Sequence, residues 1–336
     1  RHPAVTQAVV AAREDREGDK RLVGYLIADP AAISHSELEQ WKQEQVDQWR
    51  DLWQNAYEAG EVEDPAFNIS GWNSSYSGEP IPAQEMREWV ESTAARINAL
   101  EPDRVLEIGS GTGLLVARVA PGCSEYVATD FSPAAIAAIE HLKTQRPDLA
   151  CVTARQTSAD DLALVHDQQF DTIIINSVAQ YFPDQDYFVS MLQTITERLA
   201  PNGRIFLGDL RSLSLIDAYH TSVQLYKSEP ELSLEKLNER IRQRIEQEEE
   251  LLLDPAIFDR LGELLPRLVH VELQLKRGET RNEMSCFRYD AVLRFDHAET
   301  AAPAEQIDGR DLSSIAEISE RLAAATGSAI EFTGLH

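Results

Sequence analysis

Residues 104–113, which read R-V-L-E-I-G-S-G-T-G, constrain the fold more than any other part of the chain. The apolar positions Val105, Leu106 and Ile108 predict a short, buried parallel strand. Three glycines follow at every second position, and glycine lets a chain turn sharply and lets a ligand approach the backbone closely. A helix expected over residues 114–119 directs its first N–H groups back at this loop. The segment therefore predicts the opening strand–turn–helix unit of an α/β fold.

An acidic residue, Glu107, lies inside the end of this strand, and the glycines are spaced G-x-G-x-G. Dinucleotide-binding folds use G-x-G-x-x-G, and a carboxylate beside the loop repels a pyrophosphate but suits an ammonium or sulfonium group. The next predicted strand, residues 126–129, ends in Asp130, which is placed to accept both hydroxyls of a ribose. These acids predict a cationic ligand with a ribose and disfavour a nucleotide-dependent oxidoreductase. A tight turn with a solvated Glu107 is the alternative.

The composition limits the partners and the compartment. The chain has 336 residues and a formal net charge of −26, which argues against nucleic acid or an anionic membrane as a partner. We find no apolar run of membrane-spanning length and no signal-peptide pattern. The three cysteines form no C-x-x-C pair and the eight histidines have no metal-ligand spacing, so we expect reduced thiols, no metal and a cytoplasmic location.

Predicted strands and helices alternate after the glycine loop, which favours a parallel sheet. Further strands are expected at residues 151–155, 170–176 and 204–208, and residues 268–275 and 287–295 form a closing antiparallel hairpin. Ligands bind open α/β sheets at the carboxyl ends of the strands, so the segment after residue 176 faces the same crevice as the glycines.

Several motifs together resemble a known family. The pattern E-x-G-x-G-x-G resembles the first motif of class I S-adenosylmethionine-dependent methyltransferases. The segment N-S-V-A-Q-Y-F-P at 176–183 is similar to the second motif of methyltransferases embedded in nonribosomal peptide synthetases. The segments G-D-L-R at 208–211 and N-E-M-S-C-F-R-Y-D at 282–290 resemble two further motifs of that family. The resemblance implies an α/β class I (Rossmann-like) fold, with a seven-stranded, mostly parallel sheet, a closing antiparallel hairpin and a helical lid insertion.

The resemblance also implies S-adenosylmethionine as the cofactor and S-adenosylhomocysteine as the product. Its expected binding residues are Tyr76, Glu107, Gly109, Ser110, Gly111, Gly113, Asp130, Phe131, Ala159, Asp160, Asn176 and Ser177. Ala159 and Asp160 follow the third strand, where the adenine ring is expected; a helix N-cap by Ser158 or Asp160 is compatible with that role. Tyr76 contacts the cofactor or substrate, or else only plugs a lid.

The catalytic candidates are Tyr181, Glu283 and Asp209, and the substrate-binding candidates are Gln180, Arg211 and Asn282. Each weak acceptor is suited to orienting an amine and taking its proton. The alternatives are a structural ion pair of Asp209 with Arg211 and an ordinary polar turn around Glu283.

The expected domains follow the motifs. Residues 1–29 contain H-P-A-V and then G-D-K-R-L-V-x-Y, and resemble a fragment of the adenylation C-terminal subdomain. Residues 30–100 are expected to form a helical cover and an aromatic loop. A stripe with Trp41, Trp49 and Trp53 in this cover is expected to pack as core, and a roof over the cofactor pocket is the alternative. The methyltransferase core spans 101–298 with its lid at about 212–266, and 299–336 is a C-terminal extension. We expect an excised fragment of a longer synthetase.

The resemblance implies N-methylation of an aminoacyl thioester on a phosphopantetheinyl carrier domain, with an adenylation domain in the parent polypeptide. An α-amino group titrates near ~7.7–8.0, so part of it is already neutral near pH 7 and no strong base is required. O- or C-methylation by the same fold is one alternative; an alcohol needs a positioned base, and His220 is the histidine nearest a motif. An inactive structural or carrier-docking insertion is the other.

Overall fold

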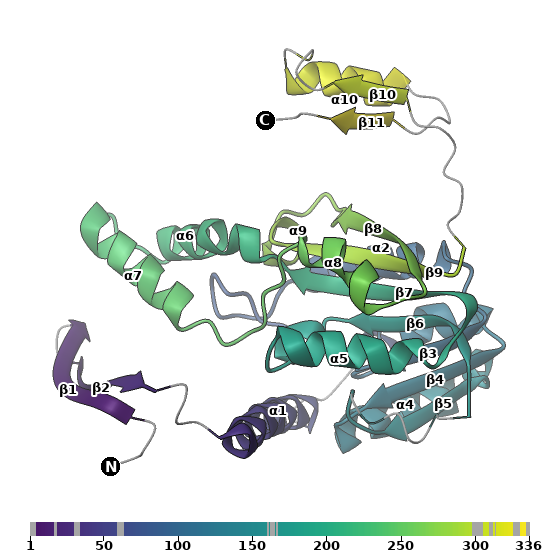
Figure 1. Ribbon diagram of the computed structural model, residues 1–336, viewed down its shortest axis with the longest axis horizontal. Coiled ribbons are helices and arrows are strands. Elements are labelled where there is room, and N and C mark those ends of the chain that lie inside the picture. The colour runs from purple at the N-terminus through teal and green to yellow at the C-terminus, as the bar shows by residue number, and fades with distance from the viewer. Residues whose placement is uncertain are drawn as a thin grey trace.

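The fold is built on one seven-stranded sheet with the strand order β5-β4-β3-β6-β7-β9-β8 (Figure 1). The computed structural model describes residues 5–16, 19–29, 34–58, 64–159, 161, 165, 167–297, 305–308, 312, 314–324 and 330–333. The strands are β3 (Arg104–Ile108), β4 (Glu125–Asp130), β5 (Val152–Gln156), β6 (Phe170–Asn176), β7 (Leu199–Arg211), β8 (Leu268–Leu275) and β9 (Arg288–Phe295). Five run parallel, and β9 pairs antiparallel with both β7 and β8. This arrangement confirms the predicted class I methyltransferase sheet with its closing hairpin.

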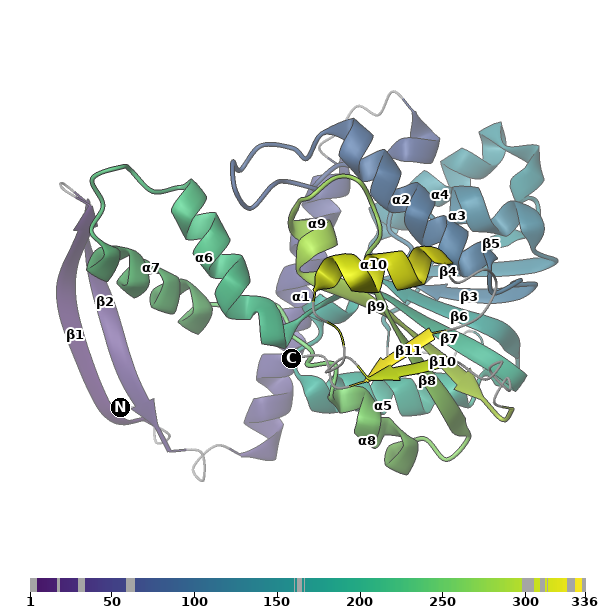
Figure 2. The same ribbon diagram turned by 90° about the horizontal axis from the view of Figure 1, so that it is seen from above.

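Helices cover both faces of the sheet, because each strand of its centre is apolar on both sides (Figure 2). One face packs against α2 (Ala83–Asn98), α3 (Val116–Val119) and α4 (Pro133–Gln145). The other face packs against α5 (Gln185–Thr196) and α8 (Ile257–Leu264). The helix expected at 114–119 is only one turn long, and a 3₁₀ turn containing Pro121 follows it. The sheet therefore lies between two layers of helices, and the carboxyl ends of its strands lie at one edge of this sandwich.

The segment after β7 is only partly a lid. It holds α6 (Ile216–Tyr226) and α7 (Leu234–Glu246), which project beyond the sheet, and then α8 (Figure 1). Phe258 and Leu261 of α8 are buried in the core beside α5. The segment expected as the lid, at about 212–266, therefore includes α8, which belongs to the core because its apolar side chains pack on the sheet.

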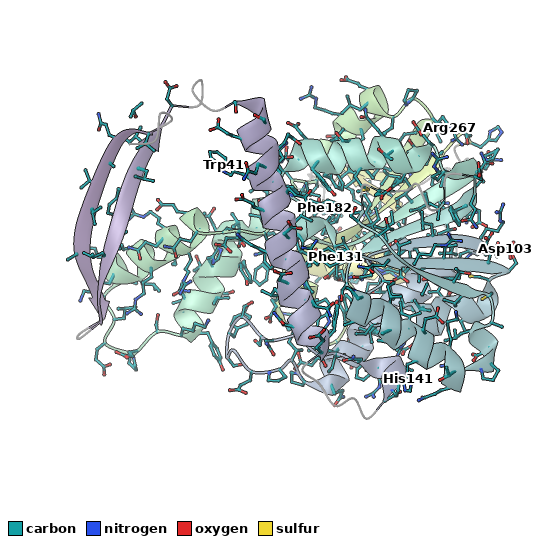
Figure 3. The ribbon with its side chains drawn as sticks, turned by 90° about the horizontal axis from the view of Figure 1, so that it is seen from below. Trp41, Asp103, Phe131, His141, Phe182 and Arg267 are labelled. Atoms are coloured by element: carbon teal, nitrogen blue, oxygen red, sulfur yellow. The ribbon has the colours of Figure 1, made fainter. Side chains whose placement is uncertain are left out.

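The long helix α1 (His35–Glu58) lies outside the two layers (Figure 3). It runs across the edge of the sheet beside Phe131 and Phe182. Gln54 accepts hydrogen bonds from the hydroxyl of Ser132 (2.6 Å) and the N–H of Ala134 (3.2 Å), and Lys42 pairs with Asp184 (3.1 Å). These contacts fix both ends of α1 against the starts of α4 and α5.

The terminal segments form small units of their own. The strands β1 (Val5–Arg16) and β2 (Asp19–Ala28) pair as an antiparallel hairpin. The strands β10 (Glu305–Asp308) and β11 (Ile330–Thr333) pair in parallel, with α10 (Ile315–Ala324) between them in the chain. Four-residue α9 (Glu283–Cys286) precedes β9. Among the described residues, no helix is long and apolar enough to cross a membrane.

The glycine loop has little room for a side chain. Gly109 has a φ of +73°, and a Cβ built on it would overlap Cγ2 of Val178. Replacing Gly109 with Ala should lower the free energy of unfolding by about 1–3 kcal/mol, because the new methyl group must displace Val178 in a left-handed backbone conformation. Urea unfolding measures this change. Gly122→Ala is the matched control, since nothing lies within 4 Å of its Cβ position, and it should change stability by less than about 0.5 kcal/mol. Equal stabilities of the two variants would contradict the prediction.

Candidate active site

A deep cleft opens at the carboxyl ends of β3, β4 and β6, where the predicted crevice lies. It contains about 1060 Å³ of space between the protein atoms, its open mouth included. The glycine loop forms its floor. The N–H groups of Gly109 (2.8 Å) and Ser110 (2.9 Å) donate to the carbonyl of Thr129 and tie the loop to β4. We call this space the cofactor cleft.

Glu107 lies at the bottom of the cofactor cleft and is 3% exposed. The hydroxyl of Tyr126 donates to its Oε2 at 2.7 Å. Burial raises the pKa of Glu107 to about 7, against the hydrogen bond from Tyr126, and the nearby carboxylate of Asp130 raises it further. Glu107 is therefore partly protonated at neutral pH, and a ligand with a positive charge would favour its ionised form.

Asp130 ends β4 on the same wall and is 5% exposed. Its Oδ2 accepts from the N–H of Gly111 (2.8 Å) and its Oδ1 from the N–H of Ser132 (2.8 Å). Burial raises the pKa of Asp130 to about 6, although both backbone hydrogen bonds act to lower it. Because Asp130 lines the cleft, its carboxylate can also accept a hydrogen bond from a ligand hydroxyl.

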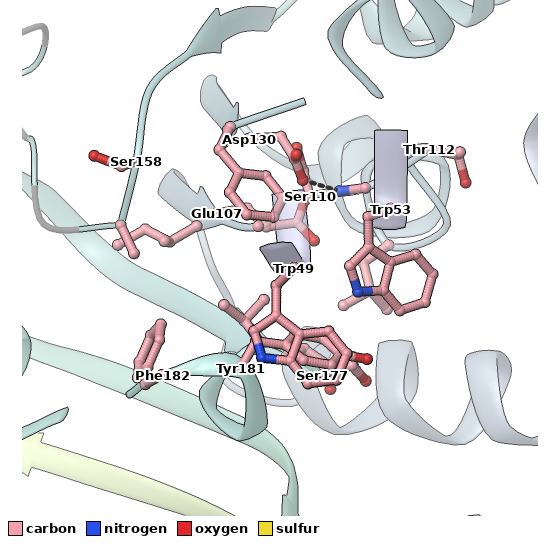
Figure 4. Close-up of a pocket in the computed structure, with 18 of the residues that line it drawn as sticks. Trp49, Trp53, Glu107, Ser110, Thr112, Asp130, Ser158, Ser177, Tyr181 and Phe182 are labelled. Atoms are coloured by element: carbon pink, nitrogen blue, oxygen red, sulfur yellow. Dashed lines mark hydrogen bonds between the residues drawn. The ribbon is translucent and has the colours of Figure 1, made fainter. Parts of the chain in front are cut away.

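Aromatic side chains of α1 close the cofactor cleft from above (Figure 4). Trp49 lies against Tyr181 with the ring centroids 4.7 Å apart, and Trp53 lies 5.6 Å from Tyr181. Trp53 also contacts Tyr57 (5.5 Å) and Trp72 (6.2 Å). Trp49 and Trp53 thus form a roof over the cleft, whereas the sequence favoured packing as core; Trp41 of the same stripe does not line the cleft.

Polar atoms without partners point to a ligand in this cleft. Among the described residues, Nε1 of Trp53 and Oδ1 of Asn176 are buried and have no hydrogen-bond partner. Both residues line the cleft. A buried donor or acceptor without a partner costs about 1–3 kcal/mol, so a bound molecule with its own donors and acceptors fits this cavity.

Most predicted cofactor residues come together here. The lining includes Glu107, Gly109, Ser110, Gly111, Asp130, Phe131, Ala159, Asn176 and Ser177, and also Tyr181. Gly113 has a φ of +91° and packs against Ile139 below the loop. Asp160 lies outside the described residues. The sequence did not single out Thr112, Leu114 or Tyr187, which also line the cleft.

Tyr76 does not reach the cofactor cleft. Its hydroxyl lies 2.9 Å from Oγ of Ser222, and its ring packs edge-on against Tyr226, with centroids 5.5 Å apart. Both partners belong to α6, so Tyr76 fastens its loop to the lid, as the second interpretation of this residue held. Trp72 of the same loop lines the cleft instead.

Asp209 is the most extensively bonded of the catalytic candidates. It is fully buried with a φ of +63°. Its oxygens accept from Nε1 of Trp89 (3.1 Å), the hydroxyl of Ser177 (2.8 Å) and the guanidinium of Arg288. Burial alone would raise the pKa of Asp209, but the cations of Arg288 and Lys276 hold it below its usual value. This geometry favours a structural ion pair over a proton acceptor, and the ion pair is with Arg288, not with the predicted Arg211.

A second cavity, the polar pocket, lies beyond Ser177 and Arg288. It is lined by Ser75, Arg211, Tyr219, His220, Arg244, Gln247, Glu248, Glu250, Glu283, Phe287 and Arg288. Arg211 is held by Glu248 (2.8 Å) and Glu250 (2.9 Å). Nε2 of His220 lies 3.2 Å from Glu248, and burial lowers the pKa of His220 despite that neighbour. The sequence did not single out Ser75, and Arg288 was present in it only as part of the motif at 282–290, without an assigned role.

Glu283 lines the polar pocket, and Tyr181 lines the cofactor cleft. Glu283 is 5% exposed, and Ser75 N–H (2.6 Å) is its one hydrogen-bond donor within the described part of the chain. Burial raises the pKa of Tyr181, so its hydroxyl stays protonated. Gln180 is 2% exposed, and its backbone carbonyl accepts a hydrogen bond from the N–H of Leu251 (2.7 Å). Asn282 caps α9 and donates to Glu85 (2.7 Å), so it lies outside the polar pocket.

Comparison with known proteins agrees with this arrangement. A family model described as a methyltransferase domain matches residues 106–205. Chondramide synthase cmdD of Chondromyces crocatus is 43% identical over 311 residues, which cover 90% of this chain and 8% of that protein. A probable non-canonical nonribosomal peptide synthetase of Salinispora arenicola is 35% identical, over 94% of this chain and 4% of that protein. The chain spans less than a tenth of the length of these relatives.

Among solved structures, the DhpI–SAM–HEP complex is 18% identical with a TM-score of 0.47, and the match covers 78% of this chain and 99% of that one.

Cofactor binding should tighten as the pH rises. A carboxyl whose pKa is about 6 or 7 in the free protein must lose its proton to accept hydroxyl groups or to face a cation. Binding then releases protons, and ionisation of Asp130 alone should raise the affinity for S-adenosylmethionine on the order of tenfold from pH 5 to pH 7, an increase to which ionisation of Glu107 adds. Calorimetry in buffers of different ionisation enthalpy measures both quantities. Asp130→Asn should bind more weakly and with a flatter profile, whereas a flat wild-type profile would rule out the proposed role of Asp130.

Proposed function

The chain belongs to the S-adenosylmethionine-dependent methyltransferases and is homologous to segments of nonribosomal peptide synthetases, and from this premise we propose that it N-methylates carrier-bound amino acids. The acceptor is the α-amino nitrogen of an aminoacyl thioester on the phosphopantetheine arm of a carrier domain. The parent polypeptide, which we expect in the cytoplasm, carries that carrier and an adenylation domain.

The single observation that carries this proposal is the carboxylate of Glu283 in the polar pocket. It is buried, lines the polar pocket together with Arg288, and accepts a hydrogen bond from the backbone N–H of Ser75. A carboxylate of this kind can accept an N–H of an amine and direct the nitrogen lone pair toward the cofactor cleft. Tyr181, which stays protonated, lines the cofactor cleft and can hold the acceptor by a hydrogen bond.

The reaction demands alignment more than strong base catalysis. When bound, S-adenosylmethionine supplies a methyl group on a sulfonium. The amine lone pair forms the new N–C bond as the C–S bond breaks, and the surplus proton leaves the nitrogen for Glu283 or for water. Holding the two groups in line can contribute roughly 7–11 kcal/mol. We place cofactor contacts on Glu107, Asp130 and the glycine loop, and acceptor contacts on Glu283 and Tyr181.

O-methylation of a carrier-bound hydroxyl is a second candidate, and His220 favours it. An alcohol needs a general base, and the imidazole of His220 lines the polar pocket with a lowered pKa, so it is neutral near pH 7. We rank this below N-methylation, because His220 is already engaged with Glu248. An inactive insertion would not bind S-adenosylmethionine, which calorimetry tests directly.

Glu283→Gln should slow methyl transfer about 10²-fold or more, because an amide accepts the amine N–H less strongly and takes no proton. Its dissociation constant for S-adenosylmethionine should stay within about twofold of wild type, since Glu283 lies outside the cofactor cleft. Intact-mass spectrometry on a panel of carrier-loaded aminoacyl thioesters measures the rate, and fragmentation places the methyl group on N, O or C.

Glu279→Gln is the control for this substitution, because Glu279 is an exposed acid in the same connection between β8 and β9. Its rate should equal that of the wild type. Wild-type turnover by Glu283→Gln would remove Glu283 from the mechanism, and a methyl group found on a side-chain oxygen would favour the role of His220.

A further inference from the structure

A third cavity, which we call the α1 groove, lies open between α1 and the segment that leads from α7 to α8. Its α1 wall consists of Trp41, Glu44, Gln45, Gln48, Trp49 and Leu52, spaced so that they share one helical face. The opposite wall includes Leu213, Ile245 and residues 248–252. The α1 groove holds about 1790 Å³ of space between protein atoms, its open side included.

The α1 groove borders both cavities of the active site. Trp49 forms part of the wall of both the α1 groove and the cofactor cleft. Glu248 and Glu250 form part of the wall of both the α1 groove and the polar pocket. The inner end of the α1 groove therefore lies next to both cavities.

We propose that the α1 groove binds the pantetheine arm of the acceptor, with the outer end of the arm at Trp41 and its thioester at Trp49. This inference rests on the proposed function and names the path by which the acyl group reaches its site. The arm is an uncharged chain with two amide groups and a pair of methyl groups, and it ends in the sulfur that bears the amino acid.

The length of the groove suits this occupant. Eight residues separate Trp41 from Trp49, so the helix wall between them is about 12 Å long. Twelve bonds separate the terminal oxygen of pantetheine from its sulfur. At the roughly 3.5 Å per three bonds of an extended chain, they span about 14 Å. An arm that begins just outside Trp41 thus brings its sulfur to Trp49.

The chemistry of the walls also suits it. Apolar side chains stand open at the surface there: Trp41 is 44% exposed, Leu52 51% and Leu213 41%. They can cover the methyl groups of the arm. Nε2 of Gln45 makes only a long contact of 3.5 Å to the carbonyl of Glu249, so an amide of the arm can replace it.

The charge of the groove lining determines which part of the acceptor enters the α1 groove. Among the described residues that line the α1 groove there are four glutamates and no lysine, arginine or histidine. Glu248 and Glu250 are paired with Arg211, so Glu44 and Glu249 supply the remaining negative charge, which attracts the ammonium form of an aminoacyl group and repels a phosphate. The phosphate and the carrier domain therefore stay outside, and the neutral arm with its cationic end lies within.

The test measures binding separately from catalysis. The long probe is an aminoacyl-pantetheine amide, in which nitrogen replaces the reactive sulfur. The short probe stops after the first amide, and at about 6 Å it does not reach Trp41. Calorimetry with the S-adenosylhomocysteine-loaded protein gives both dissociation constants. Trp41→Ala should weaken the long probe roughly tenfold and change the short probe less than twofold.

Leu38→Ala is the matched control, because Leu38 is 42% exposed on the same helix and does not line the α1 groove. It should bind both probes as the wild type does. A second variant, Gln45→Trp, should weaken the long probe by filling the groove. No binding of the long probe by the wild type, or equal binding by wild type and Trp41→Ala, would overturn the inference. Selective binding without methyl transfer would support the groove and instead refute the proposed N-methylation.

Discussion

The ion pair between the buried carboxylate of Asp209 and Arg288 is the interaction on which the polar pocket depends, because Arg288 lines that pocket. Asp209 binds Arg288 and the hydroxyl of Ser177, and its backbone N–H donates to Asp290 at 2.8 Å. Lys276 bridges the two acids, at 2.9 Å from Asp290 and 3.7 Å from Asp209. This network ties β7 to β9 and to the turn after β6. Removing one partner of a buried ion pair typically costs about 3–5 kcal/mol, because the other charge is left without compensation. The position of Ser177 at the edge of the cofactor cleft is thus fixed by charged side chains that do not themselves line that cleft.

The cofactor half is held in a different way. Its glycine loop is fixed by backbone hydrogen bonds to β4, and its two acids, Glu107 and Asp130, are buried with raised pKa values. An acid with a raised pKa destabilises the folded protein at pH values above the pKa of the unfolded chain, since its ionised form is less favoured in the fold than in water. A ligand that brings hydroxyl groups and a positive charge removes that penalty. The cleft therefore favours a cationic ligand over an anionic one.

The sequence predicted the cofactor half because its signals are local. A strand, a glycine loop and an acid at the tip of the next strand determine one another within about 30 residues, and the structure brings them together in one cleft. The polar pocket depends on contacts between segments that are distant in the sequence. Arg288 lies 79 positions after Asp209, and Ser75 binds Glu283 across 208 positions. No periodicity records such pairs, so Tyr76 was expected in the cleft although it fastens the lid, and α8 was assigned to the lid although its apolar side chains complete the core.

The helix α1 links the two halves, although the minimal fold does not require it. Its side chain Trp49 covers the cofactor cleft, packs 4.7 Å from Tyr181 and also ends the α1 groove. A shift of α1 on cofactor binding would therefore change the shape of the acceptor path, and by thermodynamic reciprocity an acceptor that favours one position of α1 would change cofactor affinity by the same factor. The anchors of α1, Gln54 on Ser132 and Lys42 on Asp184, lie at opposite ends of the helix. Between them the contacts to the core are mainly aromatic, and such contacts permit the small sliding motions through which the two ligands can influence one another.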